Sequence, residues 1–101
     1  MSYKTTISAK DLSLEQIEEI LYQAEQVGRS YIYRQIPAKE IKTLEIVIDF
    51  DYKEELTIEC IITIECNNKS QKDPKRVSDE AVEKVFEFLE GQLKLNSSGR
   101  G

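Results

Sequence analysis

The alternation of apolar and polar positions predicts two strands in the middle of the chain. Apolar side chains occupy every second position between residues 44 and 52, and the same alternation repeats between residues 56 and 66. A period of two is typical of a strand that buries one face. Only three polar residues separate the two segments, so they are predicted to form an antiparallel hairpin.

A helical period precedes this hairpin. Apolar residues recur every three to four positions, and Ser13 followed by Gln16 has the spacing of a capping box. Pro37 forces the residue before it out of helical geometry, so the helix is predicted over about residues 13–35. On this interpretation Gly28 faces the core and lets another backbone approach. The alternative is that the helix breaks at Gly28.

A second helical period follows the hairpin. Asp73 and Pro74 are residue types that favour the N-cap and the first turn, and apolar residues then recur at helical spacing as far as Leu93. The length of 101 residues is that of one domain. We predict a single domain over residues 1–95 and a disordered tail of small and polar residues at 96–101.

The order helix, strand, strand, helix predicts an α+β fold with two layers, in which two amphipathic helices cover an antiparallel hairpin. Two strands make a narrow sheet, and both of its edges would expose unpaired backbone groups. Three completions are open: an N-terminal edge strand at residues 3–9, a second copy of the chain, or a strand from a foreign partner. We expect the homodimer, because residues 3–9 are short and polar and because Val47 and Ile61 leave apolar positions on the outer face.

Composition excludes several classes of chemistry. The net charge is −5, and the chain contains no histidine, the commonest general base and metal ligand. Cys60 and Cys66 are too few for a zinc site and too far apart on one strand for a disulfide. We therefore expect no catalytic residues, no metal and no cofactor, and a protein that is not an enzyme. No membrane span or signal peptide is visible in the sequence, so a cytoplasmic location is expected.

The outer face of the predicted hairpin is acidic. If the hairpin closes at Tyr52 and Leu56, Asp49 lies opposite Glu59, and like charges directly opposite each other are destabilising. A basic partner surface, a nearby lysine or a hard cation would relieve them, although side chains on a flat sheet diverge and do not form a cation cage. This face is a candidate for partner docking, and its residues are Glu45, Val47, Asp49, Asp51, Glu59 and Ile61.

A second candidate is a group of basic residues at the start of the last helix. A helix N-terminus favours anions through its free N–H groups, although the preceding loop has no glycines with which to cradle a phosphate. The leading functional hypothesis is a small protein-interaction module. The alternative is an RNA- or phosphate-binding domain that uses residues 69–76 and the following helix. The basic residues are Lys69, Lys72, Lys75 and Arg76.

Several segments together resemble an archaeal family of small uncharacterised proteins encoded near the prefoldin beta subunit. The resemblance covers about residues 13–95 and implies a cytosolic archaeal protein with an α+β fold. It transfers no activity and no functional residues, and the gene neighbourhood hints at translation or protein folding. The matching segments, in order, are the stripe from Ile17 to Ala24, Ile41-Lys42-Thr43-Leu44-Glu45-Ile46, Leu56 to Glu65, and Asp73-Pro74 leading into Ala81-Val82-Glu83-Lys84.

Overall fold

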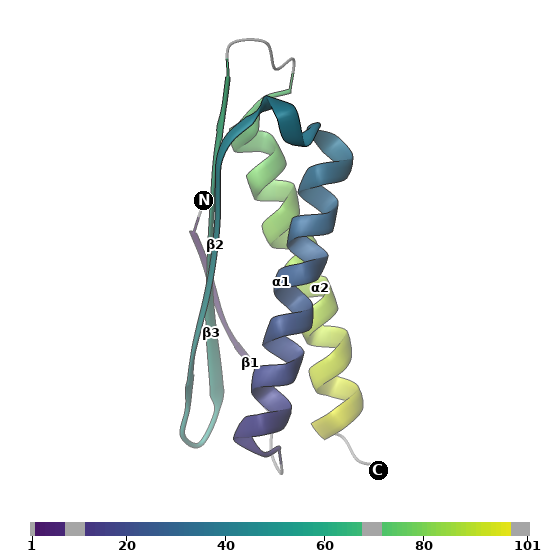
Figure 1. The fold of residues 1–101 in the computed structure, drawn as a ribbon. Helices are drawn as coiled ribbons and strands as arrows, with labels where there is room; N and C mark the ends of the chain where they lie inside the picture. Colours follow the sequence, from purple (N-terminus) through teal and green to yellow (C-terminus); the bar gives the residue numbers. More distant parts are fainter. Residues whose placement is uncertain (1, 8–11, 68–71, 98–101) are drawn as a thin grey trace.

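Two long helices pack against one face of a three-stranded sheet, which gives the molecule two layers (Figure 1). The computed structural model describes residues 2–7, 12–67 and 72–97. The predicted α+β class and the helix–strand–strand–helix order are confirmed. In chain order the elements are β1 (Ser2–Ile7), α1 (Leu14–Gln35), the 3₁₀ helix η1 (Ala38–Glu40), β2 (Ile41–Tyr52), β3 (Leu56–Cys66) and α2 (Pro74–Ser97).

Helix α1 begins and ends where the sequence predicts. The amide of Gln16 donates to the Ser13 hydroxyl at 3.1 Å, and the Ser13 amide donates to the Gln16 side chain at 2.8 Å, which completes the capping box. Ile36, before Pro37, has left the helical conformation. The helix passes through Gly28 without a break, and Gly28 is buried, so the prediction of a continuous helix with this glycine in the core is confirmed.

Helix α2 also begins as predicted. The Lys75 amide donates to the Asp73 carboxylate at 3.0 Å, which is the contact expected of Asp73 as the N-cap residue. Pro74 is the first helical residue. The helix continues to Ser97, so it includes the first two residues of the predicted tail. Residues 98–101 lie outside the described residues.

The strand order is β1-β3-β2, with both pairs antiparallel. Tyr52 pairs with Leu56, as the sequence predicts. The N-terminal segment also forms a strand, β1, and all six of its residues pair with β3. Residues 8–9 of the predicted strand lie outside the described residues. We expected a second copy of the chain to complete the sheet, and for this edge of β3 that expectation is wrong. β3 is the central strand and is more buried than β2, and its backbone groups require partners that β1 supplies.

Burial differs sharply between the two strands of the hairpin. The core-facing residues of β3 from Leu56 to Ile62 are fully buried, because β3 lies in the middle of the sheet and beneath the helices. No residue of β2 is fully buried, although its even-numbered side chains face the same layer. The half-buried members of this row are Leu44, Ile46, Ile48, Phe50 and Tyr52.

Candidate docking surface

β2 is an open sheet edge. It pairs with β3 on one side, and no described strand pairs with its other side. Its 12 residues correspond to an edge of about 40 Å at the usual rise of a strand. The backbone N–H and C=O groups on such an edge form a template for another strand.

Two hollows flank this edge, one on each face of the sheet. Each has a volume of about 270 Å³, and Phe50 contributes to both. On the helix side, Ile48 and Phe50 form an apolar floor next to α1, and we call this hollow the inner groove. The inner groove is lined by Glu18, Leu21, Tyr22, Glu25, Ile48 and Phe50. The outer hollow is lined by Asp49, Phe50, Asp51, Thr57 and Glu59.

The exposed surface of α1 carries three large hydrophobic residues among charged ones. The large hydrophobic residues that stand out as exposed in the described chain are Leu14, Tyr22 and Tyr33, at 57%, 61% and 43% exposure. At 100° per residue these three positions fall within about 100° of one another around the helix. The same arc includes Glu18 and Glu25, which line the inner groove. Of the three exposed hydrophobic residues, Tyr22 is the one that lines the inner groove.

The outer face of β2 is acidic. Glu45, Asp49 and Asp51 are exposed, and Asp49 stands opposite Glu59, as the sequence predicts. On the far side of β3, the register places Lys4 of β1 opposite Glu59. Across the three strands, the register therefore runs from Asp49 on β2 through Glu59 on β3 to Lys4 on β1.

The remaining outer-face candidates are less accessible than the carboxylates of β2. Val47 and Ile61 stand opposite each other, as predicted, and both are half-buried. The six predicted residues therefore lie on one face of the sheet, and their role in docking a partner stays a prediction. The acidic part of this face adjoins the open edge.

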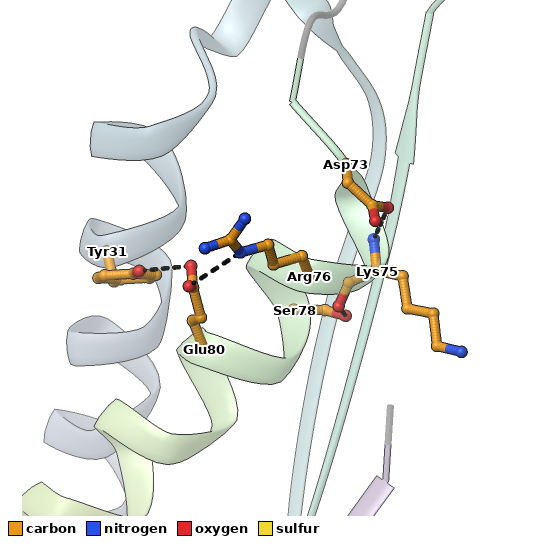
Figure 2. A network of polar contacts seen from close by, with 6 residues as sticks. All are labelled: Tyr31, Asp73, Lys75, Arg76, Ser78 and Glu80. Atoms are coloured by element: carbon orange, nitrogen blue, oxygen red, sulfur yellow. Dashed lines mark hydrogen bonds and ion pairs between the residues drawn. The ribbon is translucent and has the colours of Figure 1, made fainter.

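The predicted basic cluster does not converge. Lys69 lies outside the described residues, and Lys72 and Lys75 are exposed near the start of α2. Figure 2 shows the side chain of Lys75 extending to one side of α2, while Arg76 points toward α1. Arg76 donates from Nε to Glu80 at 3.4 Å, so its charge is shared with a carboxylate. The role of these four residues in binding an anion stays a prediction.

Glu80 joins the two helices. Its second oxygen accepts a hydrogen bond from the Tyr31 hydroxyl at 2.8 Å, so the carboxylate is held between Tyr31 of α1 and Arg76 of α2 (Figure 2). This hydrogen bond raises the pKa of Tyr31 above its ordinary value, because the carboxylate favours the protonated phenol. The geometry is that of a clamp between the two helices.

The two cysteines are separate thiols. Cys60 is fully buried in the centre of β3, where burial raises the pKa of its thiol to about 11. Cys66 at the end of the strand is half-buried, which confirms that it is the more accessible of the two. Among the residues that the structure describes, no group of three or more His, Cys, Asp or Glu side chains is arranged to hold a metal ion. The absence of metal and cofactor stays a prediction.

The sequence interpretation missed the helix side of the surface. The helical period does not predict that Glu18, Tyr22 and Glu25 line one hollow. A signal existed, because Leu14 and Tyr22 are large apolar residues on the predominantly polar face of an amphipathic helix. Their relation to Ile48 and Phe50 depends on tertiary packing and is visible only in the structure.

The described helices contain no segment that is long and apolar enough to span a bilayer. The fold and the surface together define a small two-layer α+β protein whose sheet is covered by helices on one face and has β1 and β2 as its two edge strands (Figure 1). The sequence profile of a family described as "Protein of unknown function (DUF3194)" matches residues 9–92. The chain therefore belongs to this family, which confirms the predicted membership of an uncharacterised archaeal family.

Individual relatives agree with this assignment. An uncharacterised protein of Pyrococcus horikoshii is 27% identical over 95 residues, which cover 94% of this chain and 82% of that protein. A crystal structure from Thermococcus onnurineus superposes with a TM-score of 0.79 at 27% identity and covers 99% of each chain. The solution structure of a hypothetical protein from Methanothermobacter thermautotrophicus has a TM-score of 0.74 at 25% identity, with 94% of this chain and 100% of that one covered. The gene neighbourhood implied by the resemblance stays a prediction.

Proposed function

We propose that this protein is a non-enzymatic interaction module that binds its partner by adding a strand to the open edge of β2. The observation that carries the proposal is the contrast in burial within the hairpin. The core-facing residues of β3 from Leu56 to Ile62 are fully buried, whereas those of β2 are only half-buried. A further strand beside β2 would bury the core-facing residues of β2 as completely as those of β3.

The inner groove supports this proposal because it supplies what a strand needs besides backbone partners. Strand addition derives affinity from main-chain hydrogen bonds and specificity from pockets for alternate side chains. Ile48 and Phe50 provide the apolar floor of such a pocket, and Tyr22 forms its helix side. A larger hollow, of about 410 Å³ between α1 and Gln92 of α2, is lined mainly by Glu and Gln and lacks a comparable floor.

A cytoplasmic location is part of the same proposal. Both cysteines are free thiols, which suits a reducing compartment. The anion-binding alternative receives less support, because Arg76 is held by Glu80 and Lys75 points away from it (Figure 2).

The proposal is tested by capture from a native cell lysate with immobilised wild-type protein and two variants. Tyr22→Glu places a charge in the inner groove at a side chain that is 61% exposed, so the fold should tolerate it. Gln23→Glu adds the same charge at the neighbouring position, which lines the hollow toward Gln92 instead. We expect at least one protein to be captured by wild type and by Gln23→Glu, and to be lost with Tyr22→Glu.

A third variant tests the anion-binding alternative. Lys72→Ser combined with Lys75→Ser should leave the capture unchanged, because both residues lie at the start of α2 and away from the inner groove. The proposal is wrong if no captured protein depends on Tyr22. It is also wrong if capture depends on Lys72 and Lys75 and is reduced by nuclease treatment, a result that would favour the RNA-binding alternative.

A further inference from the structure

We propose that the strand taken up by β2 is basic and amphipathic, with Lys or Arg on its outer face and apolar residues on its inner face. This inference rests on the proposed function and specifies the chemistry of the partner. Its basis is the pairing of an apolar groove on one side of the β2 edge with a row of carboxylates on the other.

The outer face of β2 sets the charge of the partner. Glu45, Asp49 and Asp51 are exposed on the edge strand, and any strand added to this edge places its own side chains directly beside them. Opposite charges across a strand pair are stabilising, and like charges are destabilising. A partner with Lys or Arg at these three positions therefore matches the edge, and an acidic partner is rejected.

The backbone register of the sheet already sets a lysine beside Glu59. At its other edge, the strand that pairs with β3 is β1, and the register sets Lys4 opposite Glu59. Asp49 stands opposite Glu59 from the β2 side and has no strand beyond it in the described chain. A basic residue beyond Asp49 would repeat, on the β2 edge, the order of residue types that the register gives between β1 and β3.

The same charges argue against a second copy of the chain at this edge. In an antiparallel pairing of β2 with itself, a two-fold axis at Val47 sets Glu45 opposite Asp49, and it does so twice. An axis at Ile48 sets Glu45 opposite Asp51, again twice. An axis at Ile46 avoids direct opposition, but it leaves Glu45 diagonal to Asp49, within reach of long side chains. A homodimer in any of these three registers of β2 is therefore disfavoured.

The inner groove sets the apolar positions of the partner. Residues opposite Ile46, Ile48 and Phe50 would point toward the helix layer, where the floor is apolar and Tyr22 and Leu21 form the wall. Taken together, the two faces specify a seven-residue pattern: basic, apolar, basic, apolar, any, apolar, basic. These positions stand opposite Asp51, Phe50, Asp49, Ile48, Val47, Ile46 and Glu45, in that order.

The test uses a synthetic peptide of sequence Lys-Val-Lys-Val-Thr-Val-Lys with blocked ends and the full-length protein, followed by titration calorimetry. Two control peptides keep the length. One replaces each lysine with glutamate, and the other has the same residues rearranged so that the lysines no longer alternate with valine. We expect measurable binding of the first peptide and at least ~10-fold weaker binding of both controls.

A charge-swapped protein makes the test specific for the site. Asp49→Lys combined with Asp51→Lys should lose the lysine peptide and bind the glutamate peptide instead. Both positions are exposed, so the fold should persist. Glu83→Lys combined with Glu90→Lys makes the same change in net charge on exposed positions of α2 and should leave the preference unchanged.

The outcomes separate this inference from the proposed function. If the lysine peptide fails to bind, or binds the charge-swapped protein equally well, the proposal that the added strand is basic is wrong. The interaction module would still stand if the lysate experiment yields a partner that depends on Tyr22. Self-association of the wild-type protein that Asp49→Lys with Asp51→Lys abolishes would instead assign the edge to a second copy and overturn the inference.

Discussion

Gly28 of α1 lies directly against Val85 of α2. A methyl group added at Gly28 would sit 2.9 Å from Cγ2 of Val85, closer than two carbon atoms can pack. Val85 is itself fully buried and is β-branched, so its side chain cannot turn aside freely. The approach of the two helices above the sheet therefore depends on the missing side chain at this position.

Replacing Gly28 with alanine should lower the free energy of unfolding by about 1 kcal/mol. Alanine favours the helical state by about 1 kcal/mol, but overpacking a filled core costs about 1–3 kcal/mol, so the steric term prevails. Urea unfolding measures the difference. A Gly28→Ala protein that is more stable than wild type would contradict the contact.

Val85→Ala provides the matching control. Alone, the Val85→Ala change should destabilise the protein by opening a cavity. In the Gly28→Ala background it also removes the clash between the new methyl group and the Val85 side chain. The double variant should therefore be more stable than the sum of the two single changes predicts, by about 1 kcal/mol. Strict additivity would show that the two positions do not touch.

Removing the charge of Asp49 should stabilise the isolated protein. Asp49 stands opposite Glu59, so Asp49→Asn should raise the free energy of unfolding by roughly 0.2–1 kcal/mol at low salt, and the gain should shrink at high salt. Asp51→Asn is the control, because its partner Thr57 is uncharged. Equal effects of the two variants would refute the repulsion.

The buried thiol of Cys60 should make the protein lose stability in alkali. Its pKa is raised from 9.0 to about 11 in the folded protein, so between these values the unfolded chain has lost the proton and the folded chain has kept it. The unfolded state is favoured increasingly over this range, and stability falls as the pH rises from about 9 to about 11. The free energy of unfolding of the Cys60→Ala variant should fall less steeply over this pH range. Identical slopes for the variant and the wild type would count against the burial of the thiol.

The hydrogen bond from Tyr31 to Glu80 should be visible in a spectroscopic titration. The pKa of Tyr31 is raised, so this residue should ionise at a higher pH than it does in the Glu80→Gln variant, which lacks the carboxylate. Stabilisation from the bond should be complete below the ordinary pKa and should disappear as Tyr31 ionises. Tyr31→Phe identifies the signal, and an unchanged pKa in Glu80→Gln would rule out the clamp.

Local signals in the sequence were sufficient for most of the fold. Ser13 and Gln16 cap α1, Pro37 ends it, and the alternation from Leu56 fixes the pairing of β2 with β3, because each depends on neighbours in sequence. The strand at Ser2–Ile7 was underestimated. Its pairing is decided by the need of β3 for a partner, and that need arises from tertiary packing.

The candidate site divides in the same way. The acidic face was predictable, because Asp49 and Glu59 follow from the register of one hairpin. The inner groove was not predictable, since it brings Tyr22 of α1 next to Ile48 and Phe50 of β2, which are distant in sequence. The basic residues near Arg76 are close in sequence, but Glu80, one helical turn further on, holds Arg76. Proximity in sequence does not make these side chains converge.

Amide hydrogen exchange of the protein with its captured partner tests the central claim most directly. We predict that binding slows exchange along β2, from Ile41 to Tyr52, and in the part of α1 around Tyr22, while the amides of Lys75 and Arg76 in the first turn of α2 are unchanged. Protection confined to that first turn, with β2 exchanging as fast as in the free protein, would contradict the claim that the open edge is the binding surface.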